Sequence, residues 1–215
     1  MARWLFKTLL IIAYLACDYG NISARVASLG LTTSLAFYVG LYLFLTAAIF
    51  FAAAIPSFIG RLMFVAIFVP ASIYLQAAEW VTNGFVTYDV FLNQFNSREF
   101  AGDALSQYGA VLMLIVPINL LLIAGILLPP GRRRVPMMGW ISSAAPIVAI
   151  IVLSVMLYKR GGEGGRALPA GFVPLSYSAL MSYEELTTEH GPRKDVALPL
   201  VGRKDDRDIV MLIDE

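Results

Sequence analysis

Four long apolar stretches constrain the fold of this chain more than any other feature. They are Leu31–Ile55, Phe58–Ala78, Ala110–Pro129 and Met137–Tyr158. A helix needs about 20 mostly apolar residues to cross the hydrocarbon core of a membrane. The chain is helical there because lipid offers no hydrogen-bond partners for backbone N–H and C=O groups. We therefore predict an all-α fold built from membrane-spanning helices.

A fifth and shorter apolar segment, Trp4–Cys17, lies at the N-terminus. We interpret it as the first of five membrane-spanning helices. The alternative is a secretory signal, because Arg3 and Lys7 precede its apolar run. Cys17 stands at a weak lipoprotein cleavage signal, and the alternative for this residue is a buried small apolar side chain.

Charge is distributed unevenly along the 215 residues, of which 59% are hydrophobic and only 14% charged. Residues 1–158 carry 13 charged side chains, whereas residues 159–215 carry 18. We therefore predict a membrane domain over 1–158 and a tail in water. The net charge of +1 excludes a nucleic-acid partner, which needs clustered basic residues. One histidine, His190, excludes a histidine-rich metal centre.

Basic residues in short loops predict the orientation, since they tend to stay on the cytoplasmic side. Arg132-Arg133-Arg134 is the strongest cluster. If it is cytoplasmic, Arg3, Lys7 and Arg61 also fall inside. Segments 18–30, 79–109 and 159–215 then lie outside, with the N-terminus in and the C-terminus out.

The outer segment 79–108 predicts one or two amphipathic helices at the membrane interface. Apolar residues recur in it at mostly helical spacing. Asp89, Asn93 and Ser97 stand at i, i+4 and i+8, so one helix face presents a carboxylate, an amide and a hydroxyl in a column. The alternative is a solvated polar face without a ligand.

The tail after residue 158 contains two segments that differ in composition. Residues 159–207 are predicted to be a linker, with a short helix over Ser176–Glu189. Residues 208–215 form an apolar run that ends in Asp214-Glu215 and is typical of a buried strand. A lone strand needs neighbours, and ligand sites of open α/β sheets lie beyond the carboxyl ends of strands. We therefore expect the first strand of a truncated α/β domain; the alternative is an acidic terminus without a role.

This order of elements resembles the N-terminal part of the phosphoethanolamine transferases of the bacterial inner membrane. The elements are the five helices, the outer amphipathic segment, the linker and the strand ending in Glu215. These enzymes belong to the alkaline phosphatase and sulfatase superfamily. The resemblance implies that Glu215 is a metal ligand and that Asn93 and Ser97 lie near the substrate. The family's next carboxylate falls at Ala101 here, which Glu99 and the Asp103-Ala104 pair flank. Of these acids we assign Glu99 to the substrate site.

The resemblance also implies the chemistry. A divalent metal, usually zinc in the family, activates a nucleophile that takes a head group from phosphatidylethanolamine and passes it to lipid A or a glycan at the periplasmic face. A sulfatase-like hydrolase is a related interpretation. The lipoteichoic-acid synthases have a similar arrangement, so the identity of the transferred group stays open. We expect this chain, with one metal ligand, to be inert by itself.

A second hypothesis comes from another class of protein. It is a non-catalytic integral membrane subunit whose periplasmic tail docks a soluble partner. A transporter is disfavoured, because charged residues inside the apolar spans are nearly absent.

Overall fold

The computed structural model describes residues 2–97, 101–130 and 136–187, and leaves undescribed the side chains of 2, 101–107 and 136–138. Within these ranges every regular element is helical. The helices are α1 (Ala2–Ala16), α2 (Tyr19–Leu29), α3 (Thr33–Ala54), α4 (Phe58–Thr82), α5 (Tyr88–Asn96), α6 (Ala101–Leu127), α7 (Pro136–Lys159) and α8 (Phe172–Thr187). The predicted all-α fold is confirmed for these residues.

Four of the helices are long and apolar enough to cross a membrane, and they coincide with the four predicted stretches. The spans lie in α3, α4, α6 and α7. Helices α1 and α2 meet at a bend of 60°, and together they form a fifth span if the bent pair is counted as one. The chain is therefore a multi-pass helical membrane protein.

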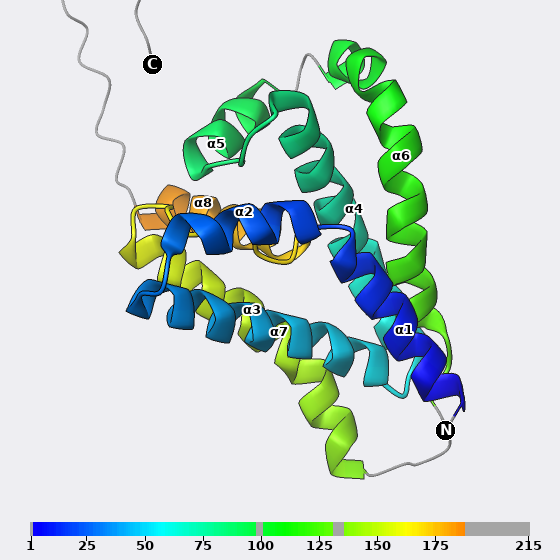
Figure 1. Ribbon diagram of the computed structural model, residues 1–215. Coiled ribbons are helices and arrows are strands. Elements are labelled where there is room, and N and C mark those ends of the chain that lie inside the picture. Colours follow the sequence, from blue (N-terminus) through cyan, green and yellow to red (C-terminus); the bar gives the residue numbers. More distant parts are fainter. Residues whose placement is uncertain (1, 98–100, 131–135, 188–215) are drawn as a thin grey trace, which may run out of the picture.

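The long helices pack as antiparallel neighbours. Helix α6 lies against α1 and α4, α3 lies against α7, and α8 packs on α7 and α4 (Figure 1). Residues at the bend between α1 and α2 lie near the C-terminal end of α4. We call this end of the bundle, which also holds α5 and α8, the α5 end.

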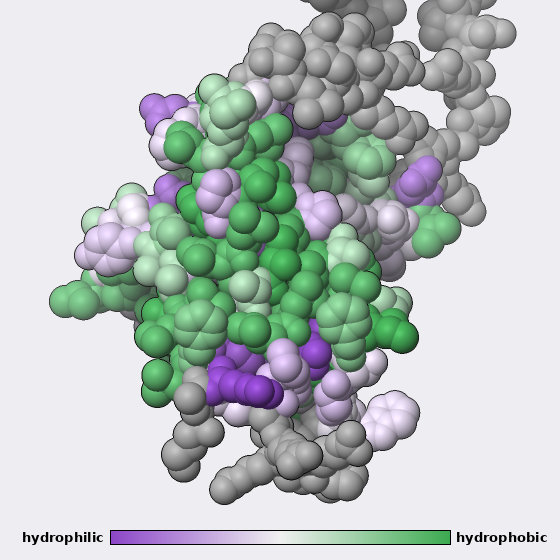
Figure 2. Space-filling view, turned by 90° about the vertical axis from the view of Figure 1, so that its right-hand side faces the viewer, coloured by the Kyte–Doolittle hydropathy of each residue, from purple (hydrophilic) through white to green (hydrophobic). Residues whose placement is uncertain are grey.

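The outer surface of the bundle is apolar across its middle. Figure 2 shows a broad apolar band on one face, with hydrophilic side chains gathered toward an end. Large apolar side chains are exposed on α6 and α7, and Met113 is 80% exposed and Trp140 84%. Such a surface is unfavourable in water but suits contact with lipid chains.

The basic residues Lys7 and Arg61 lie at the opposite end of the bundle, which we call the Lys7 end. Lys7 is fully buried, and its Nζ donates to the carbonyl oxygens of Ala53 at 2.6 Å and Leu128 at 2.7 Å. These carbonyls lie at the C-terminal ends of α3 and α6, where helices leave unpaired acceptors and favour a positive charge. Arg61 donates to the Ile55 carbonyl in the same way, at 2.8 Å. Which end faces the cytoplasm stays a prediction.

The first part of the predicted linker is folded onto the bundle. Helix α8 includes most of the predicted Ser176–Glu189 helix but begins earlier, and Phe172 and Tyr177 are buried. Phe172 packs edge-on against Phe68 of α4, with ring centroids 4.8 Å apart. This apolar contact replaces the open linker that the mixed composition suggested. The rest of the linker and the predicted strand over 208–215 lie outside the described residues.

The alternative interpretation of Cys17, a buried small apolar side chain, can be compared with its position in the structure. It lies at the end of α1, where it is exposed, and its thiol donates to the Ala13 carbonyl at 3.3 Å. It is also one of the residues that line a cavity beside the bend between α1 and α2. The interpretation of Cys17 as a buried apolar residue is therefore wrong.

Candidate functional site

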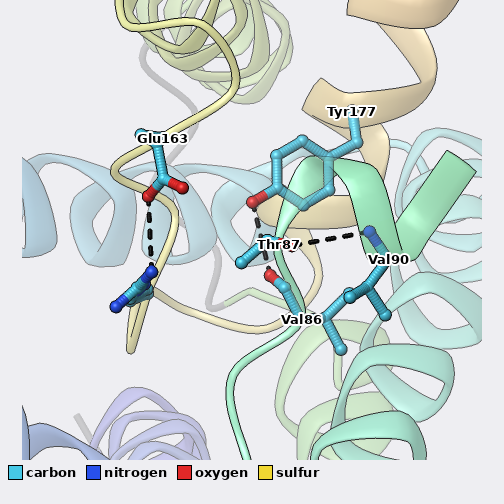
Figure 3. A network of polar contacts seen from close by, with 6 residues as sticks. Val86, Thr87, Val90, Glu163 and Tyr177 are labelled. Carbon is cyan, nitrogen blue, oxygen red and sulfur yellow. Dashed lines mark hydrogen bonds and ion pairs between the residues drawn. The ribbon is translucent and has the colours of Figure 1, made fainter.

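Helix α5 is fixed at its start by a cap and by buried apolar residues. The Thr87 hydroxyl accepts the backbone N–H of Val90 at 3.4 Å, which is a regular helix N-cap. Val86 and Phe91 are almost fully buried. Figure 3 shows the Tyr177 hydroxyl of α8 pointing at the Val86 carbonyl, to which it donates at 3.4 Å. The amphipathic helix predicted in this segment is therefore present and docked.

A second contact joins α5 to α8. The Tyr88 hydroxyl donates to the Glu184 carboxylate at 2.6 Å, and the rings of Tyr88 and Tyr177 lie 5.4 Å apart. Burial raises the pKa of Tyr88, and the bond to Glu184 raises it further. Only the neutral Tyr88 hydroxyl carries the hydrogen atom that it donates to Glu184.

The first of two hollows at the α5 end, here called the α5 cavity, lies between α4, α5, α6 and α8. Its volume is about 730 Å³. Most of its wall is apolar, and this part includes Ile67, Ala71, Phe95, Leu112 and Leu175. A cavity of this size and lining falls in the range of small-molecule sites, of about 300–1,000 Å³.

Polar groups interrupt this apolar wall. Tyr74 donates its hydroxyl to Gln94 Oε1 at 2.5 Å, and both residues line the cavity. Ser97, Tyr108 and Ser178 add hydroxyl groups. The cavity therefore combines a large apolar wall with a few groups that form hydrogen bonds.

The structure separates the predicted site residues. Ser97, at the C-terminal cap of α5, lines the α5 cavity. Asn93 is exposed on α5 and is not among the residues that line the cavity. Asp89 is also exposed. Glu99 and Glu215 lie outside the described residues, so their predicted roles stay predictions.

Sequence reasoning missed Gln94 and Tyr74. The signal for Gln94 was available, because Phe91, Gln94 and Phe95 stand at i, i+3 and i+4 and so share the face of α5 that packs inward. The polar column predicted from the sequence runs through Asn93, which is exposed on the other side of α5. Tyr74 has no comparable signal, because it lies within an apolar stretch.

The second hollow, here called the α1–α2 cavity, lies beside the bend between α1 and α2. Its volume is about 720 Å³, and residues of α4 and α6 complete its wall. Two half-buried carboxylates, Asp18 and Glu79, line it. Asn21 Nδ2 donates to Glu79 Oε2 at 3.3 Å. The two acids lie far apart in the sequence, but packing of the helices brings both to one cavity.

A metal centre is not formed by the part of the chain that the structure describes. Among those residues no three histidine, cysteine, aspartate or glutamate side chains come together. A zinc ion takes three or four protein ligands. The one predicted ligand, Glu215, lies outside the described residues, so the zinc that the resemblance implies stays a prediction and we derive no step through a metal.

The fold and the two cavities define a multi-pass membrane protein with ligand-sized hollows at one end of its bundle. Comparison with known proteins adds no relative: no family model, curated protein or solved structure matches the chain. The candidate function is therefore argued from the site alone.

Proposed function

We propose that the chain is the membrane part of a phospholipid head-group transferase of the bacterial inner membrane, and that the α5 cavity holds its donor lipid. The observation that carries the proposal is this cavity of about 730 Å³, with an apolar wall and hydroxyl and amide groups, at the end of the membrane spans. A phospholipid has the same division into an apolar and a polar part.

The polarity of the wall supports a phosphate-containing head group. Gln94 Oε1 accepts the Tyr74 hydroxyl, so the two N–H groups of the Gln94 amide are the atoms left to donate. The Ser97 hydroxyl lies in the same wall. Neutral donors of this kind can bind phosphate oxygens without excluding the positive charge of an ethanolamine head group.

The donor in this proposal is phosphatidylethanolamine, and the acceptor is lipid A or a glycan at the periplasmic face. The transfer itself belongs to a catalytic domain to which Glu215 would contribute a ligand of a divalent metal. The described residues supply lipid binding and orientation.

The transfer is tested in cells that carry the gene, compared with cells from which it is deleted. Mass spectrometry of lipid A and of envelope glycans should show phosphoethanolamine only when the gene is present. Ala71→Trp fills the α5 cavity and should abolish the modification. Ala47→Trp is the matched control, because Ala47 is exposed on α3 and does not line this cavity.

Two results would contradict the proposal. One is an unchanged set of modified lipids and glycans after deletion of the gene. The other is full modification by the Ala71→Trp variant. Lipid binding without any transferred group would favour the non-catalytic subunit instead.

A further inference from the structure

The α1–α2 cavity is lined by two acids for which the proposed function has no role. Asp18 lies at the bend between α1 and α2, and Glu79 lies near the end of α4. The two carboxylates lie close enough to repel each other. Among the described residues that line this cavity there is no lysine, arginine or histidine.

A ladder of polar contacts brings these acids together. Polar residues recur at steps of four and then three on both sides of the interface. Ser72, Gln76 and Glu79 share one face of α4, whereas the other set follows the chain across the bend from α1 to α2. The three contacts are Tyr14 with Ser72 at 2.6 Å, Asp18 with Gln76, and Asn21 with Glu79 at 3.3 Å. The matched spacing places both acids at the open end of the ladder.

Asn119 determines which way the Gln76 amide points. Asn119, 1% exposed, donates its Nδ2 to Gln76 Oε1 at 2.8 Å. Gln76 therefore presents its N–H group, and not its oxygen, to the neighbouring Asp18 carboxylate. Glu79 likewise accepts from the Asn21 amide. Both acids are thus held as acceptors by neutral donors.

Among the described residues, this negative charge has no positive partner. A carboxylate offers about four acceptor positions, and the neutral donors named above occupy only some of them. No ion pair joins Asp18 or Glu79 to a basic side chain of the described residues. A cation would stabilise the charged form of two half-buried carboxylates in a region of low polarity, because charge without a partner is costly there.

The wall favours an organic ammonium over a metal ion. The described residues include no group of three metal-ligating side chains, whereas an ammonium group needs only a few acceptors. Trp80 and Phe85 line the same cavity, and aromatic faces attract organic cations. Leu114 and Ile118 of α6 give the cavity an apolar side as well.

We propose that the α1–α2 cavity binds a primary ammonium group, with Asp18 and Glu79 accepting its N–H groups. The ammonium comes either from a small soluble amine or from the head group of an aminophospholipid. The site is distinct from the α5 cavity, and the proposal does not rest on head-group transfer.

The test uses Trp80 as a built-in reporter. The chain has three tryptophans, and replacing Trp4 and Trp140 with phenylalanine leaves only Trp80, in the cavity wall. Its fluorescence is followed in non-ionic detergent during titration with ethanolamine, choline, glycerol or calcium. A second arm compares nanodiscs of phosphatidylethanolamine with nanodiscs of phosphatidylglycerol.

We expect a saturable response to ethanolamine, or a response confined to the phosphatidylethanolamine nanodiscs. The first identifies a soluble amine as the ligand, and the second identifies a lipid head group. Asp18→Asn and Glu79→Gln should each weaken binding by about tenfold or more, since each removes a charge-assisted hydrogen bond. Glu185→Gln is the control, because Glu185 is exposed on α8 and should leave binding unchanged.

The proposal is overturned if neither arm gives a response, or if glycerol or calcium gives an equal one. It is also overturned if folded Asp18→Asn and Glu79→Gln variants bind as tightly as the parent. If neither variant folds, the titration of the parent protein with choline tests the proposal. Choline has no N–H group, so binding of choline as tight as that of ethanolamine would contradict the assigned hydrogen bonds.

Discussion

Lys7 shows how a single charged side chain can be held inside an apolar bundle. Its ammonium group contacts no carboxylate among the described residues and instead donates to carbonyl oxygens at the ends of α3 and α6. The sequence shows a basic residue near the start of an apolar segment, which predicts a place near the membrane surface. It does not show that three helices meet at this residue, because that depends on packing between distant segments.

We expect Lys7→Met to lower the free energy of unfolding by about 2–3 kcal/mol, because a methionine fills similar space but leaves these carbonyls without a donor. Thermal unfolding in detergent, followed by tryptophan fluorescence, measures the change. Lys159→Met is the control, since Lys159 is exposed at the end of α7 and its loss should have little effect. Equal stability of the two variants would show that Lys7 does not hold the helix ends.

The Tyr88 contact makes a prediction about pH. Tyr88→Phe should lower stability by about 1.5–3 kcal/mol, because it removes a hydrogen bond to a carboxylate. The raised pKa of Tyr88 means that the folded state favours the neutral hydroxyl. This stabilisation is complete below the ordinary tyrosine pKa of about 10 and is lost as the pH rises toward the raised value.

The stability difference between wild type and Tyr88→Phe should therefore be constant up to about pH 10 and narrow above it. Unfolding midpoints at about pH 8 and about pH 11 measure it, with the pH 8 value as the internal control. A difference that widens at alkaline pH would contradict the assigned direction of the hydrogen bond.

At the scale of whole elements, hydrophobic length predicts the four long helices, because a span in lipid leaves the chain no alternative to a helix. The docking of α8 could not be predicted in the same way. It depends on Gly171, where a Cβ atom would lie 2.4 Å from the Phe68 ring. That close approach leaves no periodic signal in the sequence. The helical spacing of residues beside the two cavities does not show which helices meet there, since these contacts form between segments far apart along the chain.

We expect Gly171→Ala to push α8 off the bundle, because the added methyl group meets the buried Phe68 ring and overpacking costs about 1–3 kcal/mol. Limited proteolysis in detergent should then cleave α8 faster than in the wild type. Gly40→Ala, at a site in α3 with no atom within 4 Å of an added Cβ, is the matched control. Unchanged cleavage of both variants would show that α8 does not depend on this close packing.

At the scale of the whole molecule, the alternating helices place the α3–α4 turn and the end of α4 on opposite sides of the membrane. Single cysteines at Ser57 and Asn83, both exposed, report on this in a Cys17→Ser background. A membrane-impermeant maleimide added to intact cells should label the cysteine at position 83 and leave that at 57 unlabelled. The reverse pattern would contradict the predicted orientation with the N-terminus inside.

The central claim, that the α5 cavity holds a phospholipid, is tested most directly by native mass spectrometry of the purified protein. The wild type and Ala47→Trp should each retain one phosphatidylethanolamine through detergent exchange, and Ala71→Trp should retain none, because its indole occupies the cavity. Absence of bound lipid from the wild type, or equal retention by Ala71→Trp, would contradict the account.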